Sequence, residues 1–89
     1  MTQSEVTIIN KLGLHARAAA KFVTLASRFK SEICVRKGTK EVNGKSIMGV
    51  MMLAASQGTR LSIVVSGPDE KEALEQLQAL VNKRFGEHE

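Results

Sequence analysis

The stretch Leu12-Gly13-Leu14-His15-Ala16-Arg17-Ala18-Ala19-Ala20 is where an extended segment turns into an alanine-rich helix. Before it, residues 6–10 are predicted to form a strand and residues 11–14 a turn. From Ala16 onward, apolar residues recur at helical spacing, and we expect the helix to end near Arg28 or Phe29.

This pattern places His15 at or beside the N-cap of the helix, with Arg17 in the first turn. Histidine is a second-best cap, because Ser, Thr, Asp and Asn accept hydrogen bonds from the free N–H groups more readily. The helix start favours an anion, a guanidinium neutralises phosphate oxygens, and a neutral imidazole is a nucleophile. A phosphohistidine at His15 fits all three features, whereas an exposed or capping histidine is the structural alternative; His88 is interpreted as a tail residue.

Length and composition limit the class of protein. The 89 residues are enough for one small domain, residues 1–89, and the 43% hydrophobic and 25% charged fractions are typical of a soluble one. No apolar run approaches the roughly 20 residues of a membrane span, and no signal peptide is visible, so we expect a cytoplasmic protein. Cys34, the single cysteine, is expected to be a small buried hydrophobe, and we expect no metal or cofactor.

The charge is unevenly distributed along the chain. Residues 1–60 hold ten Lys and Arg against three Asp and Glu, whereas residues 61–89 hold three against six. The basic part is suited to an acidic partner, either a protein or a nucleic acid. Phe22, Phe29 and Phe85 are the only aromatic residues and have helical-core spacing, which argues against a base-stacking platform for nucleic acid.

The rest of the chain predicts five further elements. They are strands over 32–36, 40–43 and 60–66, a helix from Ile47 to about Ala55 capped by Ser46, and a helix capped by Asp69 with Glu72 as its capping-box partner. We expect the tail from Gly86 to Glu89 to fray. The order β-α-β-β-α-β-α favours an α+β fold, with a four-stranded antiparallel sheet and three helices on one face.

The segment 47–55 is apolar on every side of a short helix. If Val50, Leu53 and Ala54 face the core, then Ile47, Met48 and Met51 or Met52 are exposed, and a methionine-rich surface adapts well to partners. The alternative is that all of these residues fill the core.

The preceding Gly44-Lys45-Ser46 is not a phosphate-binding P-loop. That motif has four residues between its glycines, whereas five residues separate Gly38 from Gly44.

Two motifs at this spacing, Gly13-Leu14-His15-Ala16-Arg17 and Asn43-Gly44-Lys45-Ser46-Ile47-Met48-Gly49, closely resemble those of the HPr phosphocarrier proteins of the bacterial phosphoenolpyruvate-dependent phosphotransferase system. The resemblance covers essentially the whole chain. It implies an open-faced β-sandwich, a phosphoryl group accepted by Nδ1 of His15 from phosphorylated Enzyme I, and its transfer to a histidine of an Enzyme IIA domain. Arg17 resembles the residue that stabilises the phosphate during transfer.

The resemblance also implies a regulatory site and a docking patch. Ser46 corresponds to a serine that a dedicated HPr kinase/phosphorylase modifies in some members, and Ala20, Ile47, Met48 and Met51 occupy positions that dock onto Enzyme I and IIA. We expect a monomeric carrier, not an enzyme. The family usually has proline where this chain has Ala18, and we expect the difference to change stability by less than about 1 kcal/mol.

Two other functions are compatible with the sequence. One is a regulatory relative, from the nitrogen-related branch or a Ser46-phosphorylated co-regulator, that acts mainly through protein–protein interaction. The other is a basic α+β nucleic-acid binder, which the lack of aromatic residues disfavours.

Overall fold

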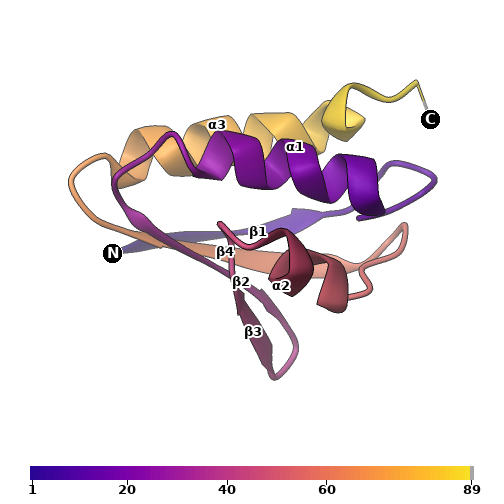
Figure 1. Cartoon of the computed structure of the whole chain (residues 1–89), viewed down its shortest axis with the longest axis horizontal. Coiled ribbons are helices and arrows are strands. Elements are labelled where there is room, and N and C mark those ends of the chain that lie inside the picture. The colour runs from indigo at the N-terminus through magenta and orange to yellow at the C-terminus, as the bar shows by residue number, and fades with distance from the viewer. Residues whose placement is uncertain (89) are drawn as a thin grey trace.

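The computed structural model describes residues 1–88 and contains the strands and α-helices in the predicted order. A short 3-10 helix, which the sequence does not predict, follows the last α-helix (Figure 1). The elements are β1 (Thr2–Thr7), α1 (Ala16–Ala26), β2 (Glu32–Lys37), β3 (Lys40–Asn43), α2 (Ile47–Met52), β4 (Arg60–Ser66), α3 (Glu70–Asn82) and the 3-10 helix η1 (Arg84–Gly86).

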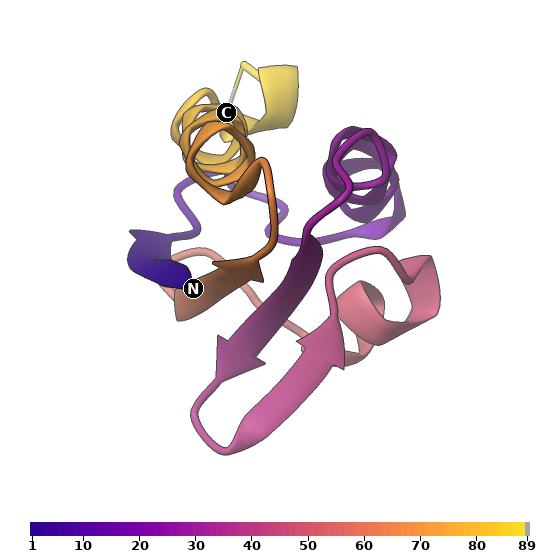
Figure 2. The ribbon, with the colours of Figure 1, turned by 90° about the vertical axis from the view of Figure 1, so that its left-hand side faces the viewer.

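The four strands form one antiparallel sheet in the order β1-β4-β2-β3. In β4, Leu61, Ile63 and Val65 are buried, as the predicted period of two requires. Helices α1 and α3 lie side by side over one face of this sheet, and α2 packs beside α1 near β3 (Figures 1 and 2). The other face is uncovered, which confirms the predicted open-faced β-sandwich.

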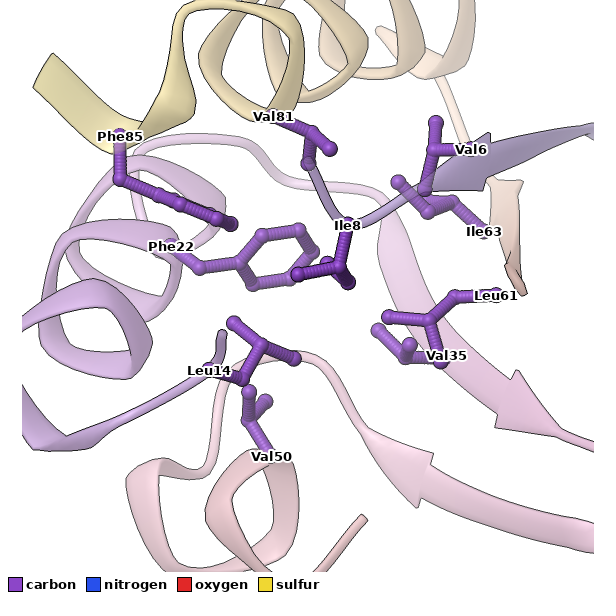
Figure 3. A pocket seen from close by; sticks show the side chains of 10 residues that line it. All are labelled: Val6, Ile8, Leu14, Phe22, Val35, Val50, Leu61, Ile63, Val81 and Phe85. Atoms are coloured by element: carbon purple, nitrogen blue, oxygen red, sulfur yellow. The ribbon is translucent and has the colours of Figure 1, made fainter. Parts of the chain in front are cut away.

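The core lies between the sheet and the helices, and ten apolar side chains surround a small gap within it (Figure 3). This cavity measures about 10 Å³, and its lining offers no polar partner for a water molecule. The gap is therefore a packing feature and not a ligand site. Its lining includes Phe22 and Phe85, two of the three phenylalanines predicted to be core residues; the third, Phe29, is also buried.

Several element boundaries differ from those predicted. Strand β1 covers Thr2–Thr7 instead of residues 6–10, because its register with β4 pairs Thr2 with Val65 and Thr7 with Arg60. Helix α1 ends at Ala26, where the following turns tighten into bonds from Arg28 N to Leu25 O and from Phe29 N to Ala26 O. Helix α2 ends at Met52 because Ala54 adopts a left-handed conformation with φ of 50°.

Asp69 is the N-cap residue of α3, as predicted, but the predicted capping hydrogen bonds of its side chain and of Glu72 are wrong. The Asp69 carboxylate makes no cap hydrogen bond to α3 and instead accepts from the backbone N–H groups of Lys30 and Ser31 and from the Ser31 hydroxyl. The hydrogen bond from the Ser31 hydroxyl, with those from the backbone, lowers the pKa of Asp69. Glu70 rather than Glu72 accepts from a free backbone group, the N–H of Gly67.

The interpretation of Cys34 is also corrected. Its neighbours Ile33 and Val35 are buried toward the helices, so Cys34 lies on the uncovered face of the sheet and is half-buried. Partial burial and the adjacent Glu41 carboxylate raise the pKa of the thiol.

Within residues 1–88, no helix is both long enough and apolar enough to cross a membrane.

Candidate functional site

His15 is the N-cap residue of α1, as predicted. Its backbone is extended, with φ of −74° and ψ of 176°, and its carbonyl accepts the first helical bond from the Ala19 N–H at 2.8 Å. The imidazole makes no cap hydrogen bond and keeps 29% of its surface exposed. The side chain is therefore available for chemistry, and the first N–H groups of the helix have no side-chain acceptor at the cap.

The loop that precedes His15 is tightly held. Gly13 has φ of +67°, and a Cβ placed on it would lie 2.5 Å from the Ala55 carbonyl oxygen. The next residue, Leu14, donates its N–H to that same oxygen at 2.9 Å, and its side chain is buried in the core. The loop and the segment after α2 thus fix each other, and only glycine fits at position 13.

Glu87 lies at the candidate site, and the sequence reasoning missed it. One oxygen of its carboxylate, Oε2, hydrogen-bonds with His15 Nε2, and the other, Oε1, accepts from the Asn10 amide at 2.9 Å. Burial, the largest single influence, raises the pKa of Glu87, but the hydrogen bonds from Asn10 and His15 and the charges of His15 and Lys21 together lower it below its usual range.

Asn10 connects this carboxylate to the loop. Its side chain is fully buried, and the same amide nitrogen that donates to Glu87 also donates to the Gly13 carbonyl at 2.8 Å. Its Oδ1 atom is buried without a hydrogen-bond partner within residues 1–88. The Asn10 amide thus links the Glu87 carboxylate to the loop before His15.

The segment after Phe85 reaches the site because it is anchored, so the prediction that the tail frays is wrong for Gly86 and Glu87; Glu89 lies outside the described residues. The Phe85 side chain is fully buried, and its carbonyl accepts from Lys21 Nζ at 2.7 Å. Arg84 and Phe85 both have positive φ, 58° and 56°, and the Glu87 N–H closes a turn onto Arg84 O. These contacts turn the chain back toward His15.

An open cavity of about 720 Å³ lies against the imidazole. Arg17 is exposed, and within residues 1–88 its guanidinium has no hydrogen bond or ion pair. His88 also lines the cavity, a position that no local sequence pattern indicates. The complete lining is Lys11, Leu12, His15, Ala16, Arg17, Glu87 and His88, whose cationic groups and helix start suit an anion.

The predicted docking patch, Ala20, Ile47, Met48 and Met51, lies on α1 and α2, which contact each other. Met48 is 74% exposed, Ile47 and Met51 are exposed to a lesser degree, and Ala20 is half-buried. Val50 and Leu53 are buried as predicted, but Ala54 is exposed because the helix has already ended. The exposed apolar surface also includes Met52, the predicted alternative to Met51, and Leu12, which the sequence reasoning missed.

Ser46 is confirmed as the N-cap of α2, since its Oγ accepts from the Gly49 N–H at 3.1 Å. It is half-buried next to the docking patch. Within the described part of the chain, no three His, Cys, Asp or Glu side chains are arranged to hold a metal ion.

Comparisons with known proteins agree on one family. Residues 2–83 match the family model described as "PTS HPr component phosphorylation site". The "Phosphocarrier protein HPr" of Neisseria meningitidis is 55% identical over 89 residues, which is 100% of both chains. The crystal structure of HPr-C-His from Thermoanaerobacter tengcongensis has a TM-score of 0.96 and 48% identity and covers 100% of both chains. The structure of an HPr dimer from that organism has a TM-score of 0.79 and 49% identity, covering 98% of this chain and 100% of the other.

Proposed function

This chain belongs to the HPr family of phosphocarrier proteins of the phosphotransferase system, and we propose that it accepts a phosphoryl group on His15 from phosphorylated Enzyme I and passes it to a histidine of an Enzyme IIA domain. The observation that carries this proposal is the position of the His15 imidazole at the start of α1. It is partly exposed, makes no capping hydrogen bond, and faces an open cavity beside the exposed Arg17. The protein is then a covalent intermediate and not a catalyst.

The site supplies what phosphoryl transfer requires, which is positioning and compensation of charge. With Nε2 bound to Glu87 and no hydrogen bond to Nδ1 within residues 1–88, Nδ1 is the ring nitrogen open to phosphorus. The Arg17 guanidinium and the free N–H groups of the first helical turn are the available donors for the three phosphate oxygens. We assign phosphate stabilisation to Arg17 on this basis.

A carrier must also release the group, and the openness of the site supports that role. The phosphate would have few ligands in the free protein, and each partner would close the cavity in turn and exclude water. We propose that the docking patch binds Enzyme I and IIA, because Ile47, Met48 and Met51 stand exposed on α2, the helix that contacts α1. An adaptable methionine surface suits a protein that binds several partners with one face.

Five further assignments complete the proposal. The chain acts as one HPr-like domain, residues 1–89, in the cytoplasm, where the phosphotransferase partners act. It works as a monomer, although several similar solved structures are dimers, and light scattering at working concentration distinguishes the two states. Phosphorylation of Ser46 by an HPr kinase/phosphorylase would place negative charge beside the docking patch and weaken docking. No nucleic acid, metal or cofactor is needed.

The test is a reconstituted transfer. The protein is incubated with Enzyme I and phosphoenolpyruvate, and the phosphorylated form is isolated and mixed with IIA proteins of the sugar type and of the nitrogen type. We expect an acid-labile, base-stable phosphoryl group that moves to the sugar-type IIA, with much slower transfer for Arg17→Ala. Transfer only to the nitrogen-type IIA would instead identify a regulatory relative.

A further inference from the structure

We infer that Glu87 is a positioning residue for phosphoryl transfer at His15: its carboxylate fixes the imidazole through Nε2 and presents Nδ1 as the nucleophilic nitrogen. This inference rests on the proposed function, because it assigns a role in the same transfer. It goes further by identifying the group that selects between the two ring nitrogens, a group brought to the site from the opposite end of the chain.

The geometry of the carboxylate supports an orienting role. Each of its two oxygens has its own partner, His15 Nε2 for Oε2 and the amide of the fully buried Asn10 for Oε1. Asn10 in turn holds the Gly13 carbonyl in the loop that leads into His15. The ring, the carboxylate and the loop are therefore joined by one series of hydrogen bonds, in which the carboxylate that holds the ring is itself held by Asn10.

The chemistry of the pair determines where the proton resides. An ionised carboxylate can only accept hydrogen bonds, and a neutral imidazole has one N–H donor and one lone pair. A hydrogen bond between Glu87 and Nε2 therefore requires the proton on Nε2 and leaves the lone pair on Nδ1. The lowered pKa of Glu87 keeps this carboxylate ionised at neutral pH.

With the proton on Nε2 and the lone pair on Nδ1, phosphoryl transfer needs no movement of a proton on the ring. The lone pair of Nδ1 forms the bond to phosphorus as the bond between phosphorus and the donor atom breaks, and the donor atom keeps that electron pair. The proton stays on Nε2, so the phosphorylated ring carries a positive charge that the Glu87 carboxylate faces. In the onward step the bond between Nδ1 and phosphorus breaks, and its electron pair returns to Nδ1.

The support for Glu87 exists before any phosphate arrives. The buried Phe85 ring and the hydrogen bond from Lys21 to the Phe85 carbonyl fix the chain two residues ahead of Glu87. None of these contacts involves Nδ1 or Arg17, so the positioning does not depend on the ligand. A site whose orienting group is held by its own packed anchor is preorganised.

The experiment has a structural readout and a kinetic one. Protein labelled with ¹⁵N in histidine is examined by NMR at about pH 9, above the ordinary histidine range, to determine which ring nitrogen of His15 carries the proton. A His88→Gln variant identifies the His15 signals. The same samples are then phosphorylated by Enzyme I with phosphoenolpyruvate, and initial rates are compared at saturating and at limiting carrier concentrations.

Glu87→Ala is the main variant, Glu87→Gln tests the charge, and Glu75→Ala is the control, because Glu75 is an exposed acidic residue on α3 away from the site. We expect a single Nε2–H form in the wild type and in Glu75→Ala, and a mixture of the two neutral forms in Glu87→Ala. Phosphorylation of Glu87→Ala at saturating concentration should be slower by about tenfold, the scale on which loss of a group that orients a histidine acts elsewhere. Glu87→Gln, which can donate as well as accept, should be intermediate.

An unchanged proton position and rate in Glu87→Ala would overturn the inference, and so would faster phosphorylation, because the carboxylate would then be a brake. In both cases the wild type still accepts phosphate. If the wild type accepts none, the proposed function itself fails and the inference falls with it, so the two failures are distinguishable.

Discussion

Replacing Gly13 with alanine tests how the loop before His15 is held. The added methyl group would lie 2.5 Å from the Ala55 carbonyl oxygen and 2.9 Å from Ser56 Cα, and both contacts are with backbone atoms that cannot rotate away. The residue would also keep a φ of +67°, which side chains other than glycine's disfavour. The matched control is Gly38→Ala, because Gly38 has a similar φ of +60° and a methyl group added there would meet no atom within 4 Å.

The expected loss of stability in Gly13→Ala is the sum of two costs, one from the backbone conformation and one from the steric clash. The left-handed backbone costs about 1–2 kcal/mol in either variant. The clash in Gly13→Ala adds about 1–3 kcal/mol, the usual cost of forcing extra atoms into a packed region. Gly13→Ala should therefore lose about 2–5 kcal/mol, and each kcal/mol lowers Tm by about 4–8 °C in a domain of this size.

Urea unfolding of the wild type and both variants measures these differences. Gly13→Ala should be less stable than Gly38→Ala by at least about 1 kcal/mol, which is the clash term alone. It should also accept phosphate from Enzyme I more slowly, because the displaced loop carries His15, whereas Gly38→Ala should not. Equal stability of the two variants, within about 0.5 kcal/mol, would refute the proposed contact between the loop and the segment after α2.

Three further outcomes are expected. Because the folded pKa of Asp69 lies below its ordinary value, the carboxylate's contribution to stability is present above about pH 4 and is lost as pH falls through the folded pKa. Asp69→Asn should therefore lose less stability than the wild type between about pH 5 and pH 2. Identical urea midpoints for the two proteins across that range would contradict the Ser31 contact. Ser46→Asp adds a negative charge beside Ile47 and should slow phosphorylation by Enzyme I without melting α2, whereas Ser46→Ala should not slow it. An undiminished rate of phosphorylation in Ser46→Asp would count against the docking patch. Ala18→Pro should change the free energy of unfolding by less than about 1 kcal/mol and leave phosphorylation intact, because the Ala18 N–H is one of the unpaired groups of the first turn. A loss of stability above about 2 kcal/mol would show that this position does not tolerate the proline ring.

Local patterns in the sequence were sufficient for much of the fold. The alternation of Leu61, Ile63 and Val65 identified β4, and Ser46 marked the start of α2, because both signals depend on neighbours a few residues away. The combined pattern of strands and helices then predicted the sheet with helices on one face. The position of His15 at a helix start followed from the same local reasoning.

Contacts between distant segments were beyond this reasoning. Glu87 is 72 residues from His15, and nothing in the tail sequence indicated that a buried Phe85 would turn it back. Asp69 is the N-cap residue of α3, but its side chain does not bond to the helix because it bonds to Ser31, which lies 38 residues away. Strand β1 began earlier than predicted because its ends depend on pairing with β4, and the sequence of β1 alone does not encode that register.

The central claim is that His15 carries the phosphoryl group, and the most direct measurement is the phosphate content and site after incubation with Enzyme I and phosphoenolpyruvate. His88 is the matched control, because it lines the same cavity and is the other of the two histidines in the chain. We predict one phosphoryl group per chain, bonded to Nδ1 of His15, present in His88→Ala and absent in His15→Ala. A group that persists in His15→Ala, or a wild type that takes up none, would contradict the account.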